Sequence, residues 1–240
     1  MNEIGSRGSF WLIAVMLSVP AIGVAVLARK SLSNVSVQER RVASAGAWRD
    51  FTELLRNRDL VQICLADGVA TACFSVFSTF IPVLVVSGLK LSAADAGWLL
   101  SSQGTAYIAA LFLSGLVLAR TGKKGLYLAS CAMIIVALFS WGATQNVSLL
   151  WTSAIILGVG LGMIGAVNVI QLSKVEGERG KIAAFNGLFM STLGVLSAML
   201  AGWVGELSSL QVVFWLMIPP FVLLSLYVLA ERENPLVRST

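Results

Sequence analysis

Long apolar runs alternate with short polar segments along nearly the whole chain. A helix needs about 20 mostly apolar residues to cross the hydrocarbon core of a bilayer. As helices, such runs also satisfy their own backbone hydrogen bonds inside lipid. We therefore predict an all-α, polytopic membrane protein. Its seven transmembrane helices are expected at residues 9–28, 60–86, 96–119, 125–143, 148–172, 182–204 and 210–230.

The composition agrees with this pattern. Of the 240 residues, 57% are hydrophobic and 12% are charged, and the mean hydropathy is +0.86. Soluble chains hold about 45–50% apolar and about 25% charged residues. A net charge of +5 would suggest nucleic acid as a partner of a soluble protein, but these charges lie between the apolar runs. We therefore expect the lipid bilayer as a partner, and no nucleic acid.

The lysines and arginines predict the orientation, because they concentrate on the cytoplasmic side of membrane proteins. With an external N-terminus, only Arg7 and Lys90 of the 17 basic residues lie outside, which leaves 15 inside. We predict a plasma-membrane protein, in a bacterial inner membrane, with the N-terminus outside and a cytoplasmic tail at 231–240. The first run is followed, not preceded, by positive charge, so we expect a retained helix and not a cleaved signal peptide.

Residues 29–59 form a long cytoplasmic loop between the first helix, in 1–28, and a six-helix block at 60–230. The second half of the loop places Trp48 and Phe51 at helical spacing with the two leucines at 54 and 55. This pattern indicates either a short helix on the inner membrane surface or a solvated linker. The residues alone leave both interpretations open.

Several classes of chemistry are disfavoured. Histidine is absent, which removes the commonest catalytic base and the commonest metal ligand. Cys64, Cys73 and Cys131 lie singly in apolar runs and are typical of small packing residues. The spans contain no pair of carboxylates that could act as acid and base. We expect no enzyme, no catalytic residue, no metal site and no cofactor.

Asp67 is the clearest candidate for a functional residue, because a charge inside a membrane span is costly. Thr71, Ser75 and Ser78 follow at offsets of 4, 8 and 11 residues and share its helix face. This polar stripe predicts one wall of a transport cavity, where the carboxylate could bind a cation or exchange a proton. In the alternative interpretation, Asp67 lies near the inner interface and bonds a neighbouring helix or Arg58.

Four amide side chains lie within other spans. Asn168 and Gln171 share a face of the fifth run, one to two turns from its inner end. They are candidates for completing the cavity, or for bonding helices together. For Asn186 on the sixth run and Gln103 on the third we favour helix packing.

The polar segment 115–124 reads Gly-Leu-Val-Leu-Ala-Arg-Thr-Gly-Lys-Lys. It resembles the cytoplasmic loop motif of the major facilitator superfamily, which has a glycine, an aspartate, a basic residue, a second glycine and two more basic residues. Ala119 occupies the aspartate position. The resemblance implies a cytoplasmic gating motif made of Gly115, Arg120, Gly122, Lys123 and Lys124.

Further segments resemble the same superfamily. Residues 177–206 look like its penultimate helix with the preceding basic loop, and 157–165 look like its glycine-rich tenth helix. Within that stretch Gly158 and Gly162 form a GxxxG pair, which predicts close helix packing. The capping-box pattern at 92–95 is similar to the outer turn between helices seven and eight. The whole chain resembles the sixth helix, the central loop and helices seven to twelve of a twelve-helix transporter.

A second inner loop carries Glu176 and Glu178. These acids are possible gate partners of the basic motif residues, since an ion pair between the two loops would hold one conformation. The alternative is that the basic residues only set the topology.

The resemblance implies secondary active transport of a small solute by alternating access, with two six-helix halves rocking about a midplane site. The expected form is drug or metabolite efflux coupled to protons. Because five family helices have no counterpart here, we expect a fragment or a half transporter. It would need the missing N-terminal half, or self-association. The alternative is a non-transporting seven-span membrane protein, such as a receptor or an assembly subunit.

Overall fold

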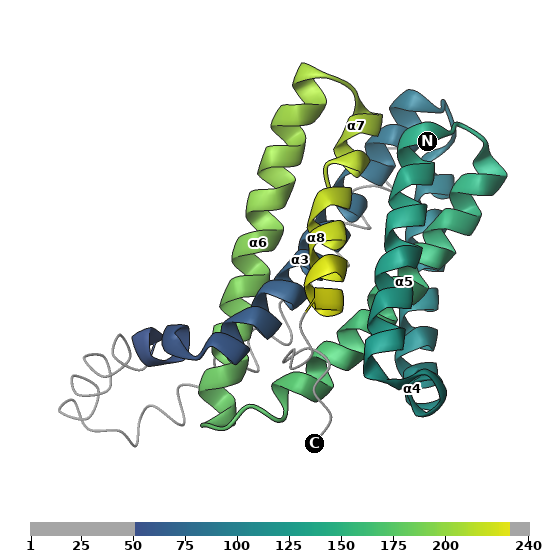
Figure 1. The fold of residues 1–240 in the computed structure, drawn as a ribbon. Helices are drawn as coiled ribbons and strands as arrows, with labels where there is room; N and C mark the ends of the chain where they lie inside the picture. Colours follow the sequence, from purple (N-terminus) through teal and green to yellow (C-terminus); the bar gives the residue numbers. More distant parts are fainter. Residues whose placement is uncertain (1–50, 231–240) are drawn as a thin grey trace, which may run out of the picture. The chain divides into compact units, whose positions relative to one another are not determined.

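The computed structural model describes residues 51–230, which form helices joined by short turns, without a strand among them (Figure 1). The predicted helix at 9–28, most of the loop at 29–59 and the tail at 231–240 lie outside the described residues. Residues 51–56 are helical, so the described end of the loop is a helix, as one of the two interpretations expects. Trp48 lies outside the described residues.

Helices account for nearly all of the described chain. They are α3 (Arg58–Val83), the π-helical segment η1 (Leu84–Gly88), α4 (Ala93–Ala143), α5 (Val147–Leu172), α6 (Arg179–Leu207), α7 (Leu210–Trp215) and α8 (Ile218–Ala230). Five stretches are long and apolar enough to cross a membrane, namely 58–88, 93–143, 147–172, 179–207 and 210–230. The predicted all-α polytopic fold is therefore confirmed for this part of the chain.

The 51-residue helix α4 consists of two spans. At 1.5 Å per residue it would be about 76 Å long, far more than the roughly 30 Å of a hydrocarbon core. Gly122 interrupts it with φ 68° and ψ 167°, a backbone conformation that glycine adopts without steric cost. The two parts agree with the predicted spans 96–119 and 125–143, so the described residues contain the six spans expected after the first.

Polar side chains cap the beginnings of three helices. Asn57 accepts a hydrogen bond from the Leu60 amide at the start of α3, and Asn146 accepts from the amide of residue 148 at the start of α5. At the start of α4, Ser92 and Asp95 form the expected capping box. The hydrogen bonds from Ser92 hold the pKa of Asp95 below its ordinary value of 3.8.

Helix α5 packs against α4, and α3 packs against α6 (Figure 1). A Cβ on Gly158 would clash with the backbone oxygen of Gln103, and one on Gly162 would press on the backbone of Tyr107. Gly160 lies against Ile134 in the second part of α4. The predicted close packing at the GxxxG pair is confirmed.

An aromatic cluster joins three helices in the core. Phe77 of α3 meets Trp141 of α4 edge-on at 5.5 Å, and Trp141 lies 5.8 Å from Phe214 of α7. All three side chains are fully buried. Rings in these arrangements contribute about 0.5–1.5 kcal/mol per pair beyond the burial of their area.

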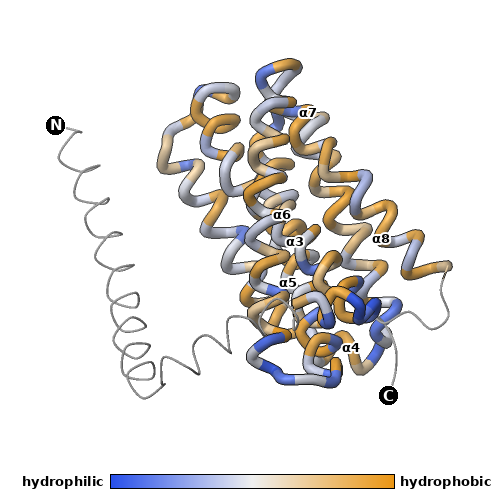
Figure 2. Tube along the Cα trace, turned by 90° about the vertical axis from the view of Figure 1, so that its left-hand side faces the viewer, coloured by the Kyte–Doolittle hydropathy of each residue, from blue (hydrophilic) through white to orange (hydrophobic). Residues whose placement is uncertain are grey.

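Hydrophilic residues gather toward the helix ends, and apolar residues occupy the middles (Figure 2). Lys124, in the turn at the kink of α4, donates to the backbone oxygen of Leu229 near the end of α8, at 3.4 Å. Its neighbour Lys123 lies within hydrogen-bonding reach of Lys174, which follows α5. The three segments predicted to share one side of the membrane therefore lie at one end of the bundle.

Candidate functional site

Asp67 lies in α3, nine residues after the start of the helix, or about 14 Å along its axis. Asn186 of α6 donates its side-chain amide to Oδ2 of Asp67 at 2.9 Å. Asn168 of α5 donates to Oδ1 at 3.3 Å. Three helices that are distant in sequence therefore meet at one carboxylate.

The two asparagines are more deeply buried than the carboxylate they contact. Asn168 is 1% exposed and Asn186 is 8% exposed, whereas Asp67 is half-buried. Each amide uses its nitrogen on Asp67, but the Oδ1 atom of each has no hydrogen-bond partner. Most buried polar atoms in proteins are hydrogen-bonded, so two orphaned oxygens beside one charged group need an explanation.

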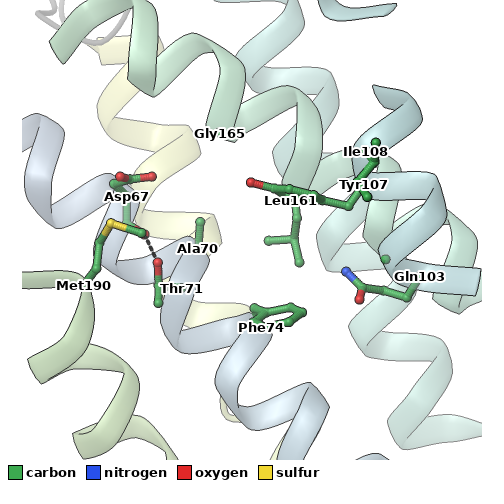
Figure 3. Close-up of a pocket in the computed structure, with 11 residues that line it drawn as sticks. Asp67, Ala70, Thr71, Phe74, Gln103, Tyr107, Ile108, Leu161, Gly165 and Met190 are labelled. Carbon is green, nitrogen blue, oxygen red and sulfur yellow. Dashed lines mark hydrogen bonds between the residues drawn. The ribbon is translucent and has the colours of Figure 1, made fainter. Parts of the chain in front are cut away.

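A cavity of about 440 Å³ opens beside Asp67, within the size range of small-molecule sites. Asp67, Thr71 and Met190 lie on one side of it, and Gln103, Tyr107 and Ile108 lie on the other (Figure 3). Asp67 is the one charged residue among those that line it. The lining residues are Asp67, Ala70, Thr71, Phe74, Gln103, Gly104, Tyr107, Ile108, Leu161, Gly165 and Met190.

Two polar residues of α4 face this cavity four residues apart. Gln103 is 1% exposed, and its Nε2 atom has no hydrogen-bond partner. Tyr107 extends to α5, where its hydroxyl oxygen would lie 3.3 Å from a Cβ at Gly165. We expected packing for Gln103, and the structure places it in the cavity wall. Tyr107 follows Gln103 by four residues and therefore shares its helix face. This spacing could have identified Tyr107 as a candidate cavity residue from the sequence.

The predicted polar stripe of α3 contributes only its first half to the cavity. Thr71 lines it and donates to the backbone oxygen of Asp67 at 3.0 Å. Ser75 and Ser78 are not among the lining residues. Ser78 donates to the backbone oxygen of Ser75 at 3.1 Å, and Ser75 lies against Gly194 of α6.

The amide candidates also divide. Asn168 contacts Asp67 directly, whereas Gln171 is 3% exposed and does not line the cavity. Asn186, for which packing was favoured, bonds two helices and does so at the candidate site itself. The two interpretations of Asp67, a cavity carboxylate and a link between helices, therefore describe the same residue.

The residues of the expected gating motif lie around the turn of α4. A Cβ at Gly115 would meet no atom within 4 Å, and Gly122 forms the turn. Hydrogen bonding with Lys174, partial burial and the charge of Lys174 lower the pKa of Lys123 from 10.5 to about 8. In the next inner loop Glu178 pairs with Lys181 at 3.0 Å.

The family model described as Major Facilitator Superfamily matches residues 63–239, which is most of the chain. The chain belongs to the Major Facilitator Superfamily. The predicted resemblance of the chain to this superfamily is thereby confirmed, and the protein is a multi-pass membrane protein.

Two proteins called multidrug transporter MdfA are similar to this chain. One is from Yersinia pestis bv. Antiqua (strain Angola) and the other from Yersinia pestis (strain D106004). Each is 28% identical to this chain over 206 residues, with 80% of this chain and 48% of the relative covered. The chain therefore spans about half the length of these two relatives.

Proposed function

We propose that the chain forms the C-terminal half of a secondary transporter that exports a small amphipathic solute by alternating access. The cavity beside Asp67 carries this proposal, because it combines an intramembrane carboxylate with apolar walls. Membership of the superfamily supports transport in preference to enzyme activity. The name of the Yersinia relatives supports a drug or a metabolite as the exported solute.

The lining residues suggest which solutes fit. Phe74, Tyr107 and Met190 offer aromatic and polarizable surface, and Asp67 offers a negative charge. Aromatic faces attract cations, and a carboxylate inside an apolar wall attracts them more strongly. A flat, apolar molecule with one positive charge meets both requirements.

Transport against a gradient needs a coupled ion, and Asp67 is the residue we assign to it. A proton is the ion expected from the sequence, but the carboxylate accepts any small cation. Ion binding at Asp67 would alter its contacts with Asn168 and Asn186, and therefore the contacts of α3 with α5 and α6. This link between ion occupancy and helix contacts is what coupling requires.

The proposed site also needs a second half. Superfamily transporters bind solute between two six-helix halves, and this chain spans about half of its named relatives. We propose that the missing N-terminal half, or a second copy of the chain, closes the cavity. The charge distribution supports an inner-membrane orientation with the N-terminus outside and the C-terminus in the cytoplasm.

The gating motif would then act at the cytoplasmic end. The turn that carries Arg120, Lys123 and Lys124 lies at the same end of the bundle as Lys174, next to the loop of Glu176 and Glu178. We propose that these acids pair with the basic turn in one transport state and release it in the other.

The test is Asp67→Asn in a complete transporter, made by producing this chain together with an N-terminal half. Efflux of a lipophilic cationic dye from cells is expected to fall at least tenfold, while the amount of protein in the membrane stays unchanged. Ser78→Ala, on the same helix but outside the cavity, is the matched control and should retain efflux. Full efflux by Asp67→Asn would refute the assigned role.

A further inference from the structure

Gln103 of α4 holds a buried nitrogen without a partner at the wall of the cavity. Its side chain is 1% exposed, and its Nε2 atom has no hydrogen-bond partner among the described residues. Gln103 lines the cavity on the side opposite Asp67, and its amide end is directed into the cavity (Figure 3). A buried donor without an acceptor costs free energy that a folded protein rarely leaves uncompensated. An acceptor is therefore expected at this point of the cavity.

The described side chains that line the cavity leave this nitrogen without an acceptor. Phe74, Ile108 and Leu161 offer only hydrocarbon. The carboxylate oxygens of Asp67 accept hydrogen bonds from two asparagines instead, and the hydroxyl of Tyr107 lies against α5. A solute that displaces water from a polar group has to replace the hydrogen bond of that water. The acceptor for this nitrogen must therefore come from the solute.

The charge of Asp67 favours the end of the Gln103 amide that faces the cavity. Nitrogen and oxygen of an amide have nearly the same size, so the surrounding electrostatics decide between the two orientations. Asp67 is the one charged residue among those that line the cavity, and side-chain amide dipoles orient in the field of the protein. A negative charge attracts the N–H end of the dipole and repels its oxygen. The orientation in the structure, with the nitrogen toward the cavity, is therefore the stable one.

We propose that Gln103 recognises a hydrogen-bond acceptor on the solute, namely a carbonyl or ether oxygen held across a flat ring system from the positive charge. This inference rests on the proposed function, in which Asp67 attracts the positive charge. The two groups lie on opposite sides of the cavity, so together they position both ends of the solute (Figure 3). A lipophilic cation without an oxygen bonds to only one of them.

Gln103 would act as much by rejecting the wrong solute as by binding the right one. An apolar group placed against Nε2 would cover the nitrogen and leave it unpaired, whereas an oxygen at the same position would accept a hydrogen bond from it. Specificity is the difference between these two affinities. One neutral hydrogen bond changes an affinity by roughly tenfold. The cavity should therefore prefer an oxygen-bearing cation over an isosteric hydrocarbon cation by about this factor.

The test compares two cations of the same shape and charge. Both are N-methylacridinium dyes, one with an acetyl group and the other with an isopropenyl group at the same ring position. The oxygen of the first is replaced by a methylene group in the second, which removes the acceptor. Binding to the full chain, purified in detergent, is followed by the fluorescence of the dye. The acetyl dye is expected to bind roughly tenfold more tightly than the isopropenyl dye.

Variants assign the preference to Gln103. Gln103→Met has nearly the same length without a donor, and it should lower the affinity for the acetyl dye to that for the isopropenyl dye. Asp67→Asn should weaken the binding of both dyes equally and keep their ratio. Ser114→Ala, at a buried serine that bonds within α4 outside the cavity, should change neither affinity.

A spectroscopic measurement on the wild-type chain reports the hydrogen bond directly. The carbonyl of an isotope-labelled acetyl dye should absorb infrared light at a lower frequency in the complex than in an apolar solvent, because the bond to Nε2 weakens the C=O bond. This measurement decides the question even where Gln103→Met fails to fold. A carbonyl frequency equal to that in the apolar solvent would contradict the proposed bond.

Two further results would overturn the role of Gln103: equal affinities of the wild-type chain for the two dyes, or a preference for the acetyl dye that survives in Gln103→Met. Tighter binding of a dye with an amino group, a hydrogen-bond donor, in place of the acetyl group would also reject it, since Gln103 would then present its oxygen. Efflux of both dyes at equal affinity would reject this inference and keep the proposed function. A Gln103-dependent preference without efflux in the complete transporter would reject the proposed function alone.

Discussion

Asn186 of α6 donates its side-chain amide to Oδ2 of Asp67 on α3 at 2.9 Å, across 119 residues of sequence. Helix α6 buries only five of its 29 residues, one of which is Asn186. Helix α6 nevertheless packs against α3 along its length, with Leu193 against Gly68. The bond between Asn186 and Asp67 is therefore a polar link within a packed interface.

Replacing Asn186 by leucine should loosen α6. The variant removes a hydrogen bond to a charged group, and we expect the free energy of unfolding to fall by about 1–2 kcal/mol. The measurement is an unfolding titration of the purified chain with a denaturing detergent. Ser140→Ala, at a partly buried serine that bonds within its own helix, should leave the midpoint unchanged. Equal midpoints for Asn186→Leu and wild type would contradict the argument.

Glycines that look alike in sequence should respond differently to alanine. A Cβ at Gly158 would clash with the backbone of Gln103, whereas a Cβ at Gly97 would meet nothing within 4 Å. We expect Gly158→Ala to destabilise the chain by about 1–3 kcal/mol through overpacking. Gly97→Ala should be neutral or slightly stabilising, because alanine favours helix. Comparable thermal stability of the two variants would speak against this α4–α5 packing.

Lys123 should be unusually reactive for a lysine. Its pKa is lowered to about 8, first by hydrogen bonding with Lys174 and then by burial and charge. At pH 8 a neutral amine is therefore abundant at Lys123, and an amine-reactive reagent should modify it early. Lys174→Gln should slow this modification by up to about 100-fold, as the pKa returns toward 10.5. Mass spectrometry of timed samples measures the rates, and an unchanged rate in Lys174→Gln would exclude Lys174 as the cause.

The lowered pKa of Lys123 also makes the stability of the folded chain depend on pH. The folded chain holds the Lys123 proton less tightly than the unfolded chain does. The charged Lys123 therefore destabilises the folded chain to its full extent below about pH 8. It declines between about pH 8 and 10.5, where the unfolded chain binds more protons, and stability should rise with pH. The difference in melting temperature between wild type and Lys174→Gln should shrink over this range. A difference that is constant with pH would argue against the linkage.

The capping box at the start of α4 should be sensitive to acid. Ser92 donates from its backbone and its hydroxyl to Asp95, which lowers the pKa of Asp95 below 3.8. The lowered pKa of Asp95 stabilises the folded chain at any pH above 3.8, the ordinary pKa of the group. This contribution is lost as the pH falls through the lower pKa that Asp95 has in the folded chain. Ser92→Ala should abolish that acid dependence of melting. Identical acid profiles of Ser92→Ala and wild type would disprove the role of the cap.

The spans were predictable from the sequence because the bilayer imposes a simple rule of length and polarity. The six runs from 60 to 230 correspond to helical spans in the structure, and the predicted break between 119 and 125 coincides with the non-helical backbone of Gly122. The cap at Ser92 and the packing at Gly158 were also predictable, since each depends on neighbours a few residues away or on the absence of a side chain. The orientation across the membrane stays a prediction.

The site was only partly predictable. Asp67 stands out because a charge in a span is rare, and Asn168 could be placed near it by depth alone. The role of Asn186 could not be separated from packing, since the same amide can bond a helix or a functional group. Phe74 and Met190 line the cavity but look like any apolar residue of a span. Which side of a hydrophobic helix faces a cavity depends on its neighbours, and periodicity carries little information when all faces are apolar.

The contact between Asp67 and Asn186 connects the charge of Asp67 to the attachment of helix α6. Helix α6 has 29 residues and is about 43 Å long, and Asn186 lies near its beginning. A change of one elementary charge at Asp67 alters the contact that holds this end of α6 to α3. Further along, Ser197 donates to the backbone oxygen of Ala72 at 3.3 Å, and Gly205 lies against Val213 of α7. A change in charge at Asp67 therefore acts on one end of a helix whose other end stays attached.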